Sequence, residues 1–202
     1  GVFFDHDKGK SHASGKLLFN CRVIPNRGSW LDFEFDVKDL LYFRVDRKKK
    51  ILVSTLLLAL GFNKSDMVDE FYDKEIYNFD NKSKKWKTKF NPENYKSKNF
   101  SEEITDVKSN KIIIKKGEKI NYLKAKKLHS DGLKEIFVSS EFLYGKYLTK
   151  QITLGEDTFK IGTELNETII SKAIEQNISI IETAYTNSIN KGPYLLQTIF
   201  NE

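Results

Sequence analysis

Strict alternation of apolar and polar residues marks two consecutive runs, at residues 30–37 and 41–46. In the first run, one face carries Leu31, Phe33, Phe35 and Val37, and the other carries Trp30, Asp32, Glu34 and Asp36. Alternation with a period of two is typical of a β-strand that buries one face. Because residues 37–39 are enough for a tight turn, the pattern predicts a β-hairpin.

The pairing of these two strands decides what surrounds Trp30. If Asp36 lies opposite Leu40, then Trp30 lies opposite Asp46 and beside the basic run at residues 47–50. A large apolar side chain is unusual on the solvent-exposed face of a strand. Trp30 either packs under a loop at the sheet edge or forms a platform on which a nucleic-acid base stacks. The pattern leaves both interpretations open.

The residues that flank the hairpin predict one strand before it and two short helices after it. Residues 16–25 are expected to form a strand, and residues 1–15 are expected to form a polar loop. After the hairpin, Ser54 is placed to cap a helix that ends at Gly61, and Ser65 is placed to cap a second helix. The two helices form a compact helical pair.

A polar, Lys-rich stretch follows at residues 78–101 and contains almost no aliphatic side chains. The absence of an apolar period predicts a loosely structured segment with one or two short strands. Trp86 lies there between two lysines. Because no alternation assigns Trp86 to a face, we predict no role for it.

An internal repeat with an offset of 45 residues follows. The sequence that starts at Lys116 aligns with the sequence that starts at Ile161. The matched turn glycines, helix caps and helix ends are Gly117 with Gly162, Asn121 with Asn166, and Gly132 with Asn177. Asn is a favoured N-cap, and Gly and Asn tolerate the left-handed conformation that ends a helix. Each repeat therefore predicts a strand, a glycine turn, a capped helix of about ten residues and a strand.

The repeats span about residues 112–148 and 158–195. Each has its own caps and its own apolar positions. We therefore expect residues 105–190 to form an independent unit of two modules that unfolds cooperatively.

Length, charge and cysteine content narrow the class of protein. The chain has 202 residues, which suits one or two domains with a buried core, and its net charge of +6 suits a polyanionic partner. Cys21 is the single cysteine, so no internal disulfide can form. Its place in an apolar strand predicts a core thiol in a reducing compartment.

Targeting signals are also missing from the sequence. No apolar run approaches the roughly 20 residues of a membrane span, so we expect no membrane partner. The chain has neither a signal peptide nor an initiator methionine. We expect it to be a segment of a longer protein.

The sequence contains no recognisable constellation of catalytic residues. It lacks a glycine-rich phosphate loop, a paired-histidine zinc helix and a Cys-His pair. Asp-His-Asp at residues 5–7 is followed by His12, but three consecutive strand residues cannot all point at one ion. The carboxylates on the polar face of the hairpin are expected to be solvated, with Arg44 neutralising one of them. We predict no catalytic residue and no metal ligand in this chain.

Five motifs along the chain point to a known family. GVFFD opens the chain, RGSWLDFEFD begins at Arg27, and RVDRKKK begins at Arg44. Further motifs are VSSEFLYGKYLTK from Val138 and IETAYTNSINKGPYLLQT from Ile181. The first three resemble the lobe of the β subunit of bacterial RNA polymerase. The last two resemble the lineage-specific insertion of that lobe and the point where the lobe resumes.

The resemblance implies an α+β fold. Residues 1–72 would be the first half of the lobe, an antiparallel hairpin and sheet with short helices, to which residues 191–202 return. Residues 73–190 would be the insertion, built of two tandem small α/β modules, which agrees with the repeat.

The resemblance also implies a function. The family performs template-directed nucleotidyl transfer with Mg²⁺ held by aspartates of another subunit, so we expect no cofactor in this chain. The lobe is a non-catalytic module that lines the downstream DNA channel and contacts the non-template strand. Expected partners are DNA, the remaining polymerase subunits and sigma factor, in the bacterial cytoplasm at the nucleoid. The alternative is a protein-interaction module whose insertion docks transcription regulators.

The resemblance extends to individual residues of the hairpin. Trp30 resembles the family tryptophan that stacks on a non-template base. Arg47 and Lys48 fall where the family has basic residues along that strand. The implied DNA-binding residues are Trp30, Arg44, Asp46, Arg47, Lys48 and Lys49. Relatives often carry arginines where this chain has Lys48, Lys49 and Lys50, which keeps the charge but loses the bidentate geometry.

Overall fold

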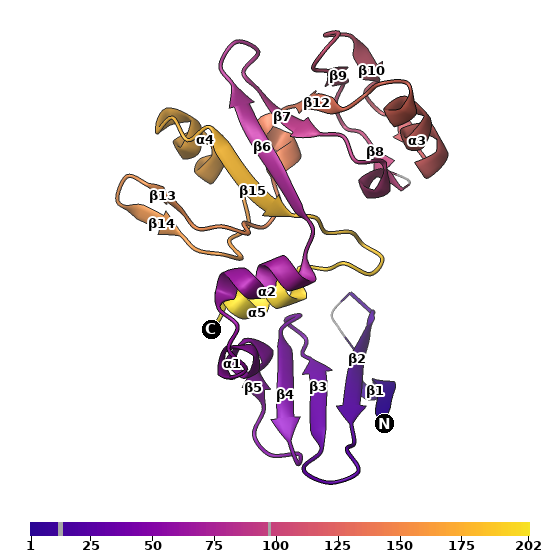
Figure 1. The fold of residues 1–202 in the computed structure, drawn as a ribbon, viewed down its shortest axis with the longest axis vertical. Helices are drawn as coiled ribbons and strands as arrows, with labels where there is room; N and C mark the ends of the chain where they lie inside the picture. Colours follow the sequence, from indigo (N-terminus) through magenta and orange to yellow (C-terminus); the bar gives the residue numbers. More distant parts are fainter. Residues whose placement is uncertain (12–13, 97) are drawn as a thin grey trace. The chain divides into compact units, whose positions relative to one another are not determined.

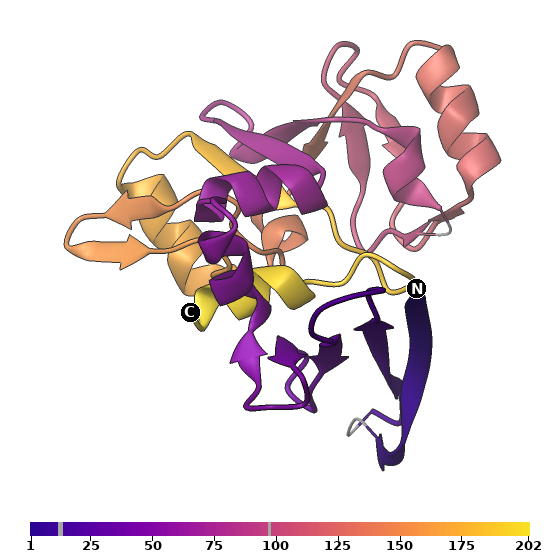
Figure 2. The same ribbon diagram turned by 60° about the horizontal axis from the view of Figure 1, so that its bottom comes forward.

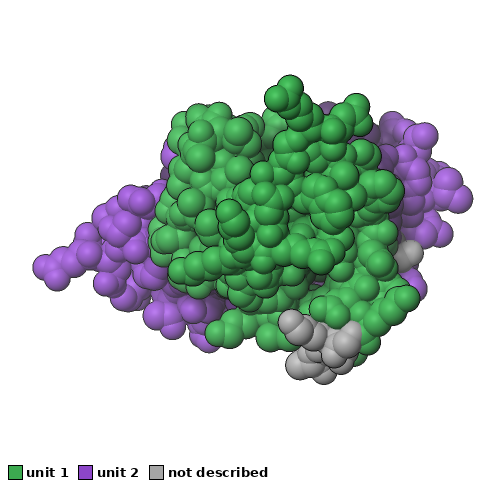
Figure 3. Space-filling view, turned by 90° about the horizontal axis from the view of Figure 1, so that it is seen from below, with its two compact units in different colours: residues 1–72, 160–163, 187–202 green, residues 73–159, 164–186 purple. Residues whose placement is uncertain are grey.

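A computed structural model describes residues 1–11, 14–96 and 98–202, so His12 lies outside the described residues. The chain divides into two compact units, which Figure 3 draws in different colours. Unit 1 holds residues 1–72, 160–163 and 187–202, and unit 2 holds residues 73–159 and 164–186. Each unit combines antiparallel strands with short helices, which confirms the α+β class.

Unit 1 is built on a five-stranded antiparallel sheet with the order β1-β2-β3-β4-β5 (Figure 1). Its elements are β1 (Val2–Ser11), β2 (Leu17–Val23), β3 (Leu31–Phe35), β4 (Leu41–Val45), β5 (Ile51–Leu52), α1 (Val53–Ala59), α2 (Lys64–Phe71) and α5 (Tyr194–Phe200). The helices α1 and α5 contact each other and β4. The strand predicted just before the hairpin is β2.

The first strand contradicts the loop expected at residues 1–15. β1 pairs with β2 in register from Val2, opposite Val23, to His6, opposite Phe19. An edge strand needs backbone pairing on one side only, and an antiparallel sheet can leave one face to solvent. Polar side chains therefore do not prevent a strand here.

Cys21 is half-buried in β2, whereas a core position was expected. Leu17 and Phe19, which share its strand face, are 51% and 58% exposed. The apolar alternation identified the face correctly, but the described parts of unit 1 leave it largely uncovered.

The cap predicted for α1 is wrong. Ser54 makes no cap hydrogen bond, and its hydroxyl donates to the carboxylate of Glu202. This partner lies 148 residues away, so local spacing could not reveal it. The left-handed helix end predicted at Gly61 is confirmed by a φ of +98°.

The cap predicted for α2 is also wrong, because Asn63 takes the place expected for Ser65. The Asn63 side chain accepts a hydrogen bond from the Asp66 N–H at 2.8 Å, and the Asp66 carboxylate accepts one from the Asn63 N–H at 3.1 Å. This reciprocal box satisfies two N–H groups that the helix leaves unpaired.

Unit 2 is built on a six-stranded antiparallel sheet with the order β10-β9-β12-β7-β6-β15. The sheet strands are β6 (Lys74–Asp80), β7 (Lys85–Lys89), β9 (Ile104–Asp106), β10 (Ile112–Ile114), β12 (Glu135–Val138) and β15 (Ile180–Ala184). The other elements are η1 (Pro92–Tyr95), β8 (Lys98–Asn99), β11 (Lys119–Ile120), α3 (Tyr122–Ser130), η2 (Ser140–Leu143), β13 (Ile152–Leu154), β14 (Asp157–Phe159) and α4 (Glu167–Glu175). β11 pairs with β8, and β13 pairs with β14.

Residues 78–101 contain more regular structure than the sequence predicts. β6 and β7 form a hairpin that lies between β12 and β15 in the sheet. In β7 the inward side chains are Trp86 and Thr88, and both are buried. An apolar face carried by one Trp and one Thr in a five-residue strand is too short a pattern to recognise from sequence.

One face of the unit 2 sheet forms the core together with α3 and α4. Figure 2 shows the backbone of these elements from a second direction. This core includes Trp86, Ile136 and Ile181 from the sheet, Ala125 from α3 and Ile170 from α4, all at most 1% exposed. Trp86 therefore has a structural role, which the sequence did not assign to it.

The 45-residue offset recurs in the secondary structure. The helices α3 and α4 have nine residues each and start 45 positions apart. Both predicted caps are confirmed, since Asn121 accepts from the Lys124 N–H at 2.8 Å and Asn166 accepts from the Ile169 N–H at 3.0 Å. The matched helix ends are also confirmed: Gly132 and Asn177 have φ of +110° and +57°.

The two repeats nevertheless share one sheet and one core. β12 pairs with β7 and β9, and β15 pairs with β6. The expectation that residues 105–190 form an independent unit needs correction. That range lacks β6 and β7, which lie between β12 and β15 in the sheet. The division into two tandem modules stays a prediction.

Candidate nucleic-acid interface

The predicted hairpin is formed by β3 and β4 in the predicted register. Asp32 lies opposite Arg44. The turn is closed by the Asp36 N–H, which donates to the Leu40 carbonyl oxygen at 3.0 Å. Asp36 Oδ1 in turn accepts the N–H groups of Lys38 and Leu40 at 2.9 and 3.0 Å. Local alternation and turn chemistry are therefore sufficient to set the two faces of the hairpin.

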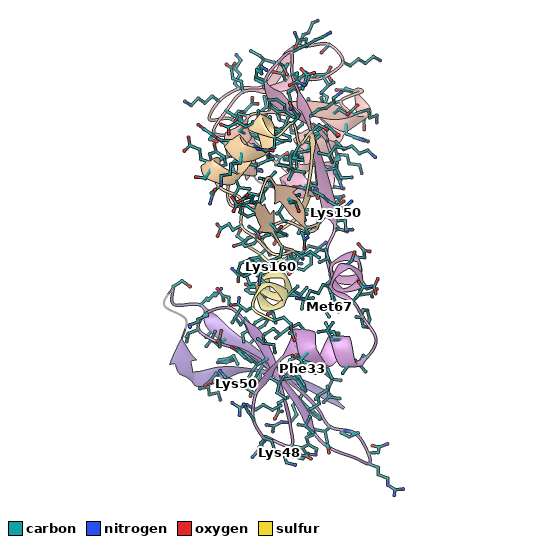
Figure 4. All side chains as sticks on the ribbon, turned by 90° about the vertical axis from the view of Figure 1, so that its left-hand side faces the viewer. Phe33, Lys48, Lys50, Met67, Lys150 and Lys160 are labelled. Carbon is teal, nitrogen blue, oxygen red and sulfur yellow. The ribbon has the colours of Figure 1, made fainter. Side chains whose placement is uncertain are left out.

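These two faces have different chemistry. Leu31, Phe33 and Phe35 line an apolar groove of about 640 Å³ together with α1 and the segment before α5. Figure 4 shows Phe33 beside α1, and Lys48 in the connection that follows β4. The opposite face carries Trp30 and the carboxylates of β3.

Trp30 lies on the polar face and is 38% exposed. The guanidinium carbon of Arg22 is 5.2 Å from the indole centroid, and that of Arg47 is 5.8 Å from it. Both distances fall within the roughly 6 Å over which a cation is attracted to an aromatic face. The indole is therefore contacted by two cations while part of it remains open to solvent.

Arg22 was not predicted as a residue of this site. It lies on β2 opposite Asp32, and its Nε donates to Asp32 Oδ1 at 2.5 Å. This bond raises the pKa of Arg22. The available signal was the polar position of Arg22 between apolar residues of its strand, but only the β2–β3 register brings it to Trp30.

Asp46 joins Trp30 to the basic run. Its carboxylate accepts the Trp30 N–H at 2.8 Å. Hydrogen bonds from the Ser29 hydroxyl and then from the Trp30 N–H lower the pKa of Asp46, with a smaller contribution from the Lys48 charge. Asp46 and Arg47 both have positive φ, +48° and +58°, and the Lys48 N–H donates to the Val45 carbonyl oxygen at 3.0 Å. These angles are those of a type I′ turn.

Arg44 is engaged within the protein. Its Nε donates to Glu34 Oε1 at 2.9 Å, and its Nη1 donates to the Lys48 carbonyl oxygen at 3.0 Å. The prediction that Arg44 neutralises a carboxylate of this face is confirmed, with Glu34 as the partner. Its second contact holds the turn that presents Lys48.

The remaining cations of the run face solvent. Lys50 Nζ lies 4.3 Å from the Tyr42 ring centroid. Arg47, Lys48 and Lys49 are exposed, and none of them has an ion-pair partner among the described residues. The basic run after Trp30 therefore presents three exposed cations that form no ion pair with the described residues.

Neither a cluster of metal ligands nor a helix able to span a membrane is found in the described parts of the chain. Across residues 1–11, 14–96 and 98–202, no group of three potential ligands is placed to hold a metal ion. Among the helices of these residues, none is long and apolar enough to cross a membrane.

Comparison with known proteins identifies the family. Residues 10–139 match the family described as RNA polymerase Rpb2, domain 2. The chain belongs to this family. The DNA-directed RNA polymerase subunit beta of Rhizobium leguminosarum bv. trifolii (strain WSM2304) is 40% identical to this chain over an alignment of 202 positions, which covers 98% of the chain and 14% of that relative. The resemblance to the β subunit of bacterial RNA polymerase is confirmed.

The residues that match the family include those of the candidate interface. Residues 10–139 include β3 and β4, Trp30 and the basic run at residues 47–50. They also include Arg22. The structure places Asp46 and Arg47 beside Trp30, whereas Arg44 supports the turn through Glu34 and Lys48.

Proposed function

We propose that this chain is part of the β subunit of a DNA-directed RNA polymerase, in which the end of the β3–β4 hairpin contacts the non-template strand in the downstream DNA channel. The observation that carries the proposal is the partly exposed indole of Trp30, which Arg47 contacts at the start of a run of exposed cations. Family membership supports it. Nucleotidyl transfer would be performed by the assembled polymerase, in which aspartates of another subunit would hold the Mg²⁺.

Each residue has a distinct task in this proposal. Trp30 stacks on an unpaired base, and stacking is worth about 1–3 kcal/mol per base. Arg47, Lys48 and Lys49 attract the phosphates on either side of that base. Arg22 supports the indole, and Arg44 and Asp46 hold the turn in place.

The proposal also assigns each of the two units to a part of the β subunit. Unit 1 would be part of the lobe, and unit 2 would be a lineage-specific insertion with two tandem modules. Partners would be DNA, the other polymerase subunits and sigma factor, in the cytoplasm at the nucleoid. The 45-residue recurrence of caps and helices supports the modular reading of unit 2.

The test compares open-complex lifetime at several salt concentrations in polymerase that contains the full subunit. Trp30→Ala should shorten the lifetime severalfold without changing its salt slope, because no phosphate contact is lost. Lys48→Ala should lower the slope of log affinity against log salt by about one unit. Lys38→Ala is the matched control, because Lys38 lies at the opposite end of the same hairpin.

Two results would contradict the proposal. An unchanged lifetime in Trp30→Ala would make the indole a packing residue at the sheet edge. Equal effects of Lys48→Ala and Lys38→Ala would mean that general charge, rather than this surface, attracts DNA.

A second candidate function is the docking of transcription regulators on unit 2. The face of its sheet that lies opposite the core exposes Ile76, Ile112 and Ile180 at 49%, 53% and 56%. Ile112→Lys and Ile180→Lys should then abolish the response to one regulator while basal elongation stays normal. If both variants still responded to every regulator tested, this surface would be excluded as a docking site.

A further inference from the structure

One lysine of unit 2 lies among aromatic rings instead of in solvent. Lys98 belongs to the short strand β8 and is half-buried. Its Nζ is 4.2 Å from the ring centroid of Phe142, 5.6 Å from that of Tyr95 and 5.7 Å from that of Phe100. The rings come from η1, η2 and the segment after β8.

Glu75, a carboxylate that acts on Lys98, is paired with another lysine. Lys146 Nζ contacts the same Phe142 ring, 5.2 Å from its centroid, and pairs with Glu75 Oε2 at 3.0 Å. Glu75 also accepts hydrogen bonds from the Tyr77 hydroxyl, at 2.8 Å, and from the Asn94 amide, at 3.1 Å. Lys98 itself has no hydrogen-bond or ion-pair partner among the described residues.

These surroundings disfavour the charged form of the amine. Burial is the main cause that lowers the pKa of Lys98, to about 8, and the Lys146 ammonium lowers it further. Glu75 and Glu102 act in the opposite direction with smaller effects. The aromatic faces attract an ammonium, but they do not replace all the hydrogen bonds that water would accept from it.

We propose that Lys98 is a site of covalent acylation by small acyl donors such as acyl phosphates. The lone pair of the neutral ε-amine attacks the acyl carbon and forms a C–N bond. The C–O bond to the phosphate breaks, the phosphate leaves with that electron pair, and the amine proton passes to solvent. The product is an uncharged amide that no longer repels Lys146.

The position of Lys98 connects this modification to the fold of unit 2. Lys98 pairs with Ile120 of β11, and α3 begins two residues later at Tyr122. Phe100 and Ile120 are buried in the core. Removal of a half-buried charge here should therefore stabilise unit 2 rather than disrupt it.

The test is acetylation of the full chain by acetyl phosphate between pH 6.5 and 9.5, followed by quantification of each lysine by mass spectrometry. At pH 7.5 roughly a quarter of a group with a pKa of 8 is neutral, against about 0.1% for an ordinary lysine. The lower nucleophilicity of a weaker base offsets part of this gain. We expect Lys98 to react about tenfold faster than the exposed Lys89, with a rate that levels off above pH 8.

Two controls test whether the surroundings of Lys98 in the folded chain, rather than its exposure, determine its reaction rate. In urea, where the chain is unfolded, Lys98 and Lys89 should react at equal rates. Lys146→Gln should shift the Lys98 profile to higher pH, because a neighbouring positive charge is lost. A Lys98 rate below that of Lys89 at every pH, or one that keeps rising to pH 9.5, would overturn the proposal. This test uses residues of unit 2 alone, so its outcome is independent of the Trp30 experiments.

Discussion

Asp46 and Trp30 are joined by two hydrogen bonds across the end of the β3–β4 hairpin. The Asp46 N–H donates to the Trp30 carbonyl oxygen at 2.9 Å, and the Trp30 N–H donates to Asp46 Oδ1 at 2.8 Å. Asp46 is also the first left-handed residue of the turn that carries Arg47 and Lys48. An acidic residue therefore organises a surface that we propose to bind a polyanion.

This pair of hydrogen bonds predicts that removing the Asp46 carboxylate shortens the open-complex lifetime, although net charge alone would predict the opposite. Asp46→Ala makes the surface more positive, so charge alone predicts longer-lived open complexes. We expect a shorter lifetime instead, because the turn and the indole lose their shared anchor. Asp46→Asn keeps an acceptor oxygen and should retain most of the lifetime. A longer lifetime in Asp46→Ala would show that charge matters here and positioning does not.

Lys98 predicts a specific dependence of stability on pH. Its pKa in the folded chain, about 8, lies below the value of 10.5 expected when unfolded. Below pH 8 both states are charged, and folding carries the full desolvation cost. Between pH 8 and 10.5 the unfolded chain binds more protons, so stability rises with pH.

Lys98→Met should remove this dependence. At pH 7 the variant should be more stable by about 2–3 kcal/mol, and the difference from the unmodified chain should shrink as the pH rises through 8. Urea unfolding at pH 7, 8.5 and 9.5 measures this difference. Lys89→Met, which changes an exposed lysine, is the control and should be neutral. A difference in the free energy of unfolding that stays constant with pH would contradict a lowered pKa of Lys98.

The repeat supplies a matched pair of glycines for a test of packing. Gly117 and Gly162 both have positive φ, +79° and +88°. A Cβ at Gly162 would lie 2.3 Å from the Leu196 carbonyl oxygen, whereas a Cβ at Gly117 meets nothing within 4 Å. Gly117→Ala should cost about 1 kcal/mol of backbone strain, and Gly162→Ala about 2–4 kcal/mol. Equal losses in urea unfolding would mean that α5 can move to accommodate the methyl group.

The sheet order of unit 2 predicts which truncation can fold. Residues 105–190 alone lack β6 and β7, so β12 would lose its partner β7 and β15 would lose its partner β6. We expect this piece to show a random-coil circular dichroism spectrum, and residues 73–186 to unfold cooperatively. Cooperative unfolding of the shorter piece would show that each repeat is self-sufficient.

The sequence alone determined the features that depend on neighbouring residues. The strict alternation at residues 30–37 set the strand faces, and the turn at Asp36 set the register that pairs Asp32 with Arg44. Asn121 and Asn166 were identifiable as caps because a cap acts on an N–H three residues away. Where such neighbours offered competing choices, as at Ser65 and Asn63, the prediction was wrong.

Tertiary structure decided the features that depend on distant partners. Arg22 reaches Trp30 because β2 pairs with β3, and Ser54, which lies inside α1, donates to Glu202 instead of capping the helix. The β6–β7 hairpin gains its place from strands that follow much later in the chain. Lys98 has a lowered pKa because rings from separate segments exclude water around it. Periodicity carries no information about such contacts, because they form only when remote segments pack and desolvate one another.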